Sequence, residues 1–170
     1  MNAVEFIKIA VEDLHRGFQS EVAPLTPEQI VYRPNKEANT IAFLLWHFSQ
    51  SEDNFVHRQV QHQAPLWEQE QWHQRLGLQP GDSGATLNAE QIGAFSPVKE
   101  ELLAYNQRVL EAARAAISSL NDSDLDRLPN PERPQMPLGR GVANLILGHG
   151  FWHLGEIRFL KGLQGMPFGR

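Results

Sequence analysis

The sequence contains 170 residues, 41% of them hydrophobic, and carries a formal net charge of −5 at pH 7. This length and composition allow one domain with a buried core and exclude a wholly disordered chain. The acidity and the scattering of Lys and Arg among Glu and Asp argue against a nucleic-acid partner, and the absence of cysteine excludes disulfides and thiolate metal ligands.

The sequence carries no signal for secretion or membrane insertion. No stretch approaches the ~18 consecutive apolar residues of a membrane-spanning helix. The N-terminal segment MNAVEFIKIAVEDLHRGF lacks the basic region and unbroken apolar run of a signal peptide. We therefore expect a cytoplasmic protein without a membrane partner, folded as a single domain over residues 1–170.

The first part of the chain predicts two long helices. In the first helix, which Pro24 ends, apolar residues recur at spacings of three and four; they are Val4, Ile7, Val11, Leu14 and Phe18. A single helical turn is expected at residues 26–29, and the second long helix from Asn39 or Thr40 to about Gln61. Its first half, IAFLLWHF, is apolar on nearly all sides and is expected inside a bundle. Its second half, SQSEDNFVHRQV, is polar and is expected to reach solvent.

The remainder predicts two further long helices between irregular connections. A short amphipathic segment starts at Pro65, and residues 77–96, rich in Gly, Pro, Ser and Asp, predict a long loop. The third long helix is expected from Pro97 with Ser96 as its cap. A linker over residues 121–137, containing NPERPQMP, leads to the last helix, which is expected from Arg140 or Gly141 to Leu163. No stretch alternates like a strand, so the sequence predicts an all-α four-helix bundle with short connecting helices.

The segment LGHGFWHLGEIRFL of the last helix is typical of a metal site. His149 and His153 are four residues apart, so their side chains lie about 40° apart around the helix axis and one turn from each other. Two imidazoles in this arrangement can reach one ion, with nitrogen–metal distances of ~2.1 Å. Glu156 falls on the same stripe. Glycines at 148, 150 and 155 suggest that another helix or a ligand approaches closely.

A third histidine lies in the second helix. His47 is surrounded by the most apolar run of the sequence, where an unsatisfied imidazole would cost about 1–3 kcal/mol. A hydrogen bond could satisfy it as an ordinary core histidine, but a metal ion shared with His149 and His153 explains all three residues together. The other histidines are interpreted as poorer candidates, and His15 is expected at the surface.

The three remaining histidines are poorer candidates for the same site. His57 and His62 lie on the polar half of the second helix, which is expected to face solvent. His73 lies in the amphipathic connector and could line a cleft, but we do not expect it to be a ligand.

With these residues in view, the sequence resembles the DinB-like superfamily of metal-dependent enzymes, whose fold is also called YfiT-like. The resemblance lies in the Trp-His pair of TIAFLLWHFSQSEDNF, in HGFWHLGEI, which is similar to the HxxxHxGQI motif of the family, and in the connector PLWEQEQWHQRLGL. It implies that His47, His149 and His153 are metal ligands. Glu156 stands where the family usually has Gln, and it could be a fourth ligand, an acceptor for an imidazole N–H or a solvated acid. The resemblance further implies an antiparallel bundle that often forms a homodimer. Members of the family include thiol-dependent transferases and isomerases.

These observations favour an enzyme with an open metal site that acts on a small-molecule substrate. We expect hydrolysis or thiol transfer, with zinc or nickel as the most suitable ions and a low-molecular-weight thiol as a possible cosubstrate. Glu156, Glu52 or Asp53 could act as general base or accept a hydrogen bond from a ligating imidazole, and only Glu156 is favoured by its position. The alternatives are a bundle that binds a metal or small ligand without catalysis, and a structural protein with vestigial histidines.

Overall fold

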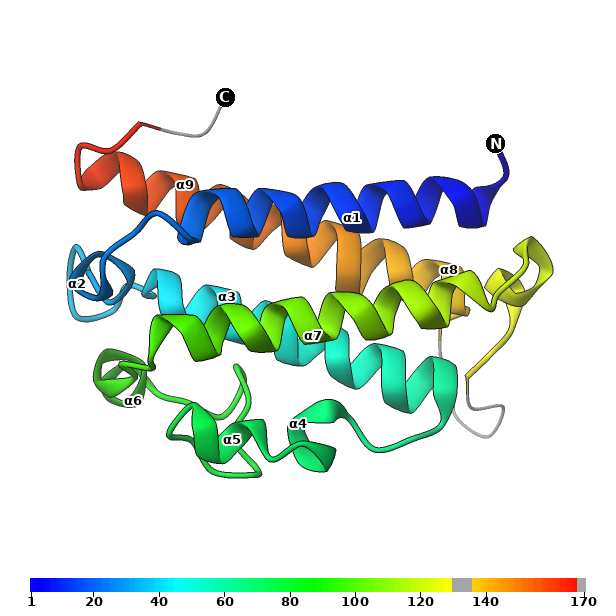
Figure 1. The fold of residues 1–170 in the computed structure, drawn as a ribbon, viewed down its shortest axis with the longest axis horizontal. Coiled ribbons are helices and arrows are strands. Elements are labelled where there is room, and N and C mark those ends of the chain that lie inside the picture. The colour runs from blue at the N-terminus through cyan, green and yellow to red at the C-terminus, as the bar shows by residue number, and fades with distance from the viewer. Residues whose placement is uncertain (130–135, 168–170) are drawn as a thin grey trace.

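The computed structural model describes residues 1–129 and 136–167, and all regular structure in these residues is helical (Figure 1). The first and third long helices are α1 (Ala3–Val22) and α7 (Lys99–Ser118), and α3 (Ile41–Asn54) continues into the π-helix η1 (Phe55–Gln61). The last long helix comprises α8 (Leu138–Gly141), the π-helix η3 (Val142–Gly148) and α9 (His149–Leu163). No strand occurs in the residues described. The predicted all-α class is therefore confirmed.

The four long helices form a bundle with two helices in each direction (Figure 1). Helices α1 and α9 run one way, and α3 and α7 run the other way. Antiparallel contacts join α1 to α7 and α3 to α9, whereas the contacts between α3 and α7 and between α1 and α9 are parallel. Because α3 and α7 are parallel, the chain between them must return along the whole bundle. This crossover carries α4 (Leu66–Gln69), α5 (Trp72–Arg75) and α6 (Ala89–Ala94).

Side chains that cap helix N-termini explain where several helices begin. Asn2 forms a capping box with Glu5 at α1, and Thr26 forms one with Gln29 at the single turn α2 (Pro27–Ile30), as predicted. The hydroxyl of Thr40 accepts a hydrogen bond from the Phe43 backbone N–H at the start of α3. A further capping box begins α6, within residues 77–96, where only loop was expected; its N-x-x-Q signature is readable in the sequence.

Two helix boundaries differ from those expected. Helix α7 begins at Lys99, two residues after the predicted start, because Val98 remains extended and Ser96 does not cap the helix. The 3-10 helix η2 (Asp122–Asp126) occupies part of the predicted linker, whose residues 130–135 lie outside the part of the chain that the structure describes.

The core confirms the apolar character of the first half of α3. Residues 41–46 are all buried, so α3 lies at the centre of the bundle. Close packing in α9 depends on Gly150, where an added Cβ would clash with Leu14 of α1 and Phe48 of α3. The expected close approach to the glycines is thus found at Gly150, whereas the space beside Gly155 is open. No helix in the described residues is both long and apolar enough to span a bilayer.

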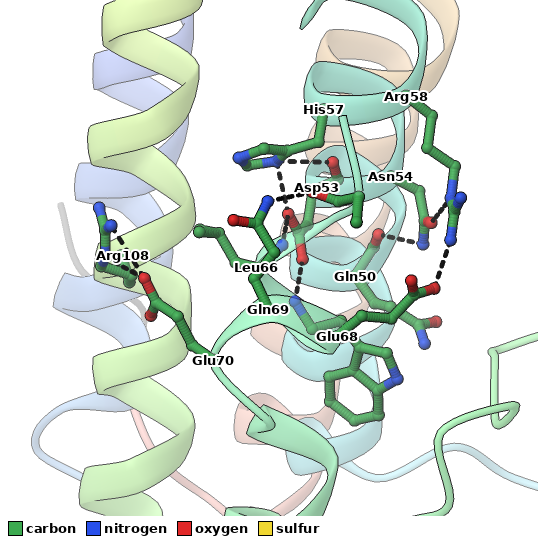
Figure 2. Close-up of polar contacts among 12 residues, drawn as sticks. Gln50, Asp53, Asn54, His57, Arg58, Leu66, Glu68, Gln69, Glu70 and Arg108 are labelled. Carbon is green, nitrogen blue, oxygen red and sulfur yellow. Dashed lines mark hydrogen bonds and ion pairs between the residues drawn. The ribbon is translucent and has the colours of Figure 1, made fainter. Parts of the chain in front are cut away.

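The polar second half of the α3 region is largely buried, contrary to expectation. Asp53 accepts hydrogen bonds from the backbone N–H groups of Leu66 (2.9 Å) and Trp67 (2.8 Å) and from the Tyr105 hydroxyl (2.8 Å). His57 lies against the same carboxylate, with Nδ1 2.7 Å from Oδ1 (Figure 2). Asp53 therefore joins α3, α4 and α7. This segment is polar because it anchors the crossover, and not because it faces solvent.

His15 is also buried, although a surface position was expected. Its Nε2 lies 2.6 Å from the Glu52 carboxylate, and both side chains are fully inaccessible to solvent. Each side chain satisfies one polar atom of the other, which lowers the cost of burying the pair. His15 Nδ1 and Glu52 Oε1 are buried without a hydrogen-bond partner among the described residues. The position of His15 off the apolar stripe therefore reflects its partner on α3.

Candidate metal centre

Three imidazoles from two helices converge at one point in the bundle. The Nε2 atom of His149 lies 3.1 Å from Nε2 of His47 and 2.8 Å from Nε2 of His153. Each ring offers one nitrogen, and these three nitrogens all lie within 4.8 Å of one another. At this spacing they could hold one metal ion. The convergence expected from the sequence is therefore present in the structure.

The fold brings these residues together through one antiparallel helix contact. His149 and His153 are on one face of α9, and His47 is on the part of α3 that packs against it. The His47 ring stacks on Phe43 one turn earlier. On another side, the ring contacts Gly84 of the crossover so closely that a Cβ there would overlap it. Packing thus fixes the orientation of His47.

The environment favours neutral imidazoles. Burial lowers the pKa of His47 to about 4, and the positive charge that His149 and His153 would carry adds to this effect. Burial, followed by the proximity of His153, also lowers the pKa of His149. A neutral imidazole presents a lone pair, which is the form in which histidine binds a metal.

Glu156 orients the third ring. Its Oε2 lies 2.5 Å from Nδ1 of His153, on the side opposite the convergence point. A proton on Nδ1 that is donated to this carboxylate leaves Nε2 unprotonated and directed towards the other two histidines. Such a carboxylate contact is the usual support for a histidine that ligates a metal. The Nδ1 atoms of His47 and His149 are both buried. That of His47 has no hydrogen-bond partner among the described residues, whereas the His149 ring interacts with the backbone of Leu145.

The other acidic candidates are engaged elsewhere. Glu52 pairs with His15 in the core, and Asp53 holds the crossover through backbone N–H groups. Their contacts explain them as structural residues, although the sequence allowed both to act as general base.

The remaining histidines do not join the cluster. His57 binds Asp53 and is buried, which corrects its expected solvent position. His62 is exposed, and the Nδ1 of His73 faces the carbonyl oxygen of Trp67 at 3.3 Å. Among the residues that the structure describes, only His47, His149 and His153 converge.

A cavity of about 560 Å³ adjoins His47. One wall is formed by the face of α3 and η1 that carries Gln50, Ser51, Asn54 and Arg58. The crossover supplies residues 83–85, and apolar side chains complete the lining, among them Phe55, Met136 and Leu145. Sequence reasoning missed Gly84, because only the folded crossover brings this residue to His47. It also missed Arg58, because only its place in the cavity lining distinguishes it from other surface cations.

Comparison with known proteins bears on the family and the fold. Residues 10–157 match the family model described as the DinB superfamily. A solved structure, described as the conserved protein of a locus from Enterococcus faecalis, superposes with a TM-score of 0.83. It shares 16% sequence identity, and the match covers 96% of this chain and 97% of that chain, so it supports the fold alone. No curated protein sequence matches the chain.

Proposed function

The chain belongs to the DinB superfamily, and from this premise we propose that His47, His149 and His153 bind one divalent metal ion for catalysis on a small molecule. The observation that carries the proposal is the convergence of the three Nε2 atoms. Three separate core histidines would each need a hydrogen-bond partner of their own. Instead, their Nε2 atoms face one another, and the buried Nδ1 of His47 has no hydrogen-bond partner among the described residues.

The donor set fits a first-row transition metal. Imidazole nitrogens suit zinc and nickel, and three neutral ligands leave coordination positions for water or substrate. An ion bound there would act as a Lewis acid that favours deprotonation of water or a thiol at neutral pH. The cavity beside His47 provides space for the molecule that reacts. Hydrolysis and transfer of a low-molecular-weight thiol are the reaction classes that fit such a site.

Glu156 is proposed to act on the reaction through His153. Its contact with Nδ1 keeps the Nε2 lone pair directed at the cluster. The carboxylate is also partly exposed, so it remains accessible as a proton acceptor. A direct role as general base requires the carboxylate itself, whereas a positioning role requires only a hydrogen-bond acceptor at this position.

The chain is further proposed to form a homodimer through the last helix. Large apolar side chains are exposed seven residues apart on α9, at Trp152 and Phe159. Seven-residue spacing keeps side chains on one helix face, and the open space at Gly155 permits close approach of a second helix. Two copies crossing in antiparallel fashion near Gly155 would bring Trp152 of each copy close to Phe159 of the other.

Metal analysis tests the proposed function. Protein purified without a histidine tag is expected to retain about one equivalent of zinc or nickel, and the His47→Ala and His153→Ala variants are expected to lose it. The exposed His62→Asn variant is the control, because asparagine tolerates the left-handed backbone at this position (φ 57°). An empty wild-type protein that also fails to take up added Zn²⁺ or Ni²⁺ would contradict the proposal. Metal uptake without activity towards thiols, electrophiles or hydrolysable esters would instead favour a non-catalytic binding bundle.

A further inference from the structure

We propose that the cavity beside His47 selects substrates with an apolar body and a carboxylate end, which pairs with Arg58. This inference rests on the proposed metal-dependent function, because it takes the histidine cluster as the place where the reactive end of the substrate is held. The site is the cavity of about 560 Å³ defined above.

The charge of the cavity lining favours an anion. Although the chain has 20 acidic and 15 basic residues, the thirteen lining residues within the described ranges 1–129 and 136–167 include no Asp or Glu and only one Lys or Arg, Arg58. The remaining lining is apolar or carries neutral amides and hydroxyls. Among the described lining residues, a carboxylate would therefore meet one positive charge and no negative charge. An ammonium group would meet only the repulsive positive charge of Arg58.

The guanidinium of Arg58 is held in place before a ligand arrives. Its Nε donates to Oδ1 of Asn54 at 3.1 Å, and the Asn54 amide donates to the backbone oxygen of Gln50 at 2.9 Å (Figure 2). Its Nη2 pairs with Glu68, and no acceptor among the described residues contacts Nη1. Two of the three nitrogens thus orient the group, and the third remains able to donate to an oxyanion.

The pair with Glu68 does not remove this capacity. About half of each side chain is exposed, with side-chain accessibilities of 47% for Arg58 and 45% for Glu68. An ion pair with this exposure is a weak interaction, because solvent competes for both charges. A substrate carboxylate can share the guanidinium with Glu68 or replace it. Glu68 is therefore expected to act as a competitor that weakens anion binding.

The distance between the two ends defines the shape of the substrate. His47 and Arg58 are eleven positions apart on one helical wall, which corresponds to roughly 16 Å along the axis at most. The Arg58 side chain shortens the space that a ligand must span. The apolar wall formed by Phe55, Met136 and Leu145 lies along the same cavity. An elongated molecule with an apolar middle segment fits these constraints.

Cobalt-loaded protein with matched thiols provides the test. The probes are mercaptoalkanoates of three, six and eight carbons and the mercaptoalkanols of equal length, so that each pair differs only in the distal carboxylate. Absorption of the bound Co²⁺ reports on the thiol end, and calorimetry gives the dissociation constant. At the best chain length, the wild-type protein is expected to bind the carboxylate at least tenfold more tightly than the alcohol. Phosphonate-ended probes distinguish carboxylate selection from general oxyanion selection.

Variants of Arg58 and Glu68 test whether Arg58 causes the preference for a carboxylate. Arg58→Gln is expected to lower carboxylate affinity to that of the alcohol and leave alcohol affinity unchanged, and Arg58→Lys is expected to retain part of the preference. Glu68→Gln is expected to strengthen carboxylate binding. Arg114→Gln is the control, because Arg114 is also a half-exposed partner of a glutamate, Glu12, and lies outside the cavity lining.

The possible failures are distinguishable. Equal affinity for acid and alcohol in the wild type, or a carboxylate preference that survives in folded Arg58→Gln, would overturn the assignment of Arg58 while leaving the metal function intact. A protein that takes up no cobalt would overturn the proposed function and this inference with it.

Discussion

Gly84 lies directly against the imidazole of His47, and an ideal Cβ at this glycine would overlap the ring, including its Nδ1 atom. The contact closes one side of His47 and leaves its Nε2 directed at His149. The crossover between α3 and α7 therefore forms part of the candidate metal centre, although it contributes no ligand to it.

The first prediction concerns this contact. Gly84→Ala is expected to displace His47 or residues 83–85 and to lower metal affinity by at least tenfold, while the fold remains intact. Metal titration monitored by calorimetry measures the effect. Gly81→Ala in the same connection is the matched control, because a Cβ at Gly81 meets no atom within 4 Å. Equal affinities in the two variants would show that the contact does not control the position of His47.

The second prediction separates the two roles of Glu156. Glu156→Ala removes the hydrogen-bond acceptor for His153 and is expected to lower metal affinity about 10–100-fold. Glu156→Gln keeps an oxygen that can accept the same hydrogen bond, so metal content should be retained. If turnover nevertheless falls in Glu156→Gln, the carboxylate has a chemical role. Unchanged turnover would restrict Glu156 to positioning, and exposed Glu100→Ala serves as the control in both assays.

The third prediction is a pH dependence of stability at His57. Burial disfavours the charged ring, but the hydrogen bond to Asp53 and the negative charge of Asp53 together outweigh this effect and raise the pKa of His57. Its contribution to the free energy of unfolding is therefore fully present below the unfolded pKa of about 6.5 and is lost as the pH rises through the folded pKa. Without metal, His57→Gln should be more destabilised relative to wild type at pH 5.5 than at pH 9.

Denaturant titrations at both pH values provide this comparison. His62→Asn is the control, since His62 is exposed and should contribute no comparable pH-dependent difference. A destabilisation by His57→Gln that is constant with pH, or that grows towards pH 9, would contradict the assignment.

The fourth prediction concerns the exposed face of the last helix. Trp152 is 71% exposed and Phe159 is 65% exposed, so their replacement by glutamate should leave the monomer folded and place charges at the proposed dimer contact. Sedimentation velocity is expected to show a dimer for the wild type and a monomer for each variant. Val98→Glu, at an exposed apolar position before α7, is the control. A monomeric wild type at micromolar concentration would rule out the proposed interface.

The sequence predicts the long helices well, because their apolar spacings and capping residues are local signals. The convergence of His47, His149 and His153 was also predictable, since the i,i+4 spacing places two rings together and the apolar surroundings of His47 place it in the interior. Their role as metal ligands stays a prediction.

The errors concern residues whose position depends on a distant partner. His15 and the second half of the α3 region were expected in solvent because polar side chains usually face water. In the structure Glu52 pairs with Nε2 of His15, and Asp53 binds backbone groups of the crossover. Local periodicity does not distinguish a solvated polar residue from one that is buried with a partner. The contact of Gly84 with His47 was missed for the same reason.

The separation of the three histidines along the chain has a consequence for biosynthesis. His47 lies on α3, whereas His149 and His153 lie on α9, beyond the crossover and α7. A nascent chain therefore offers a single imidazole of the trio until α9 has been synthesised, and one imidazole binds a divalent ion weakly. Folding of the N-terminal helices can begin during translation. Capture of an ion would then be a late event, and it would require a bundle that is already nearly assembled.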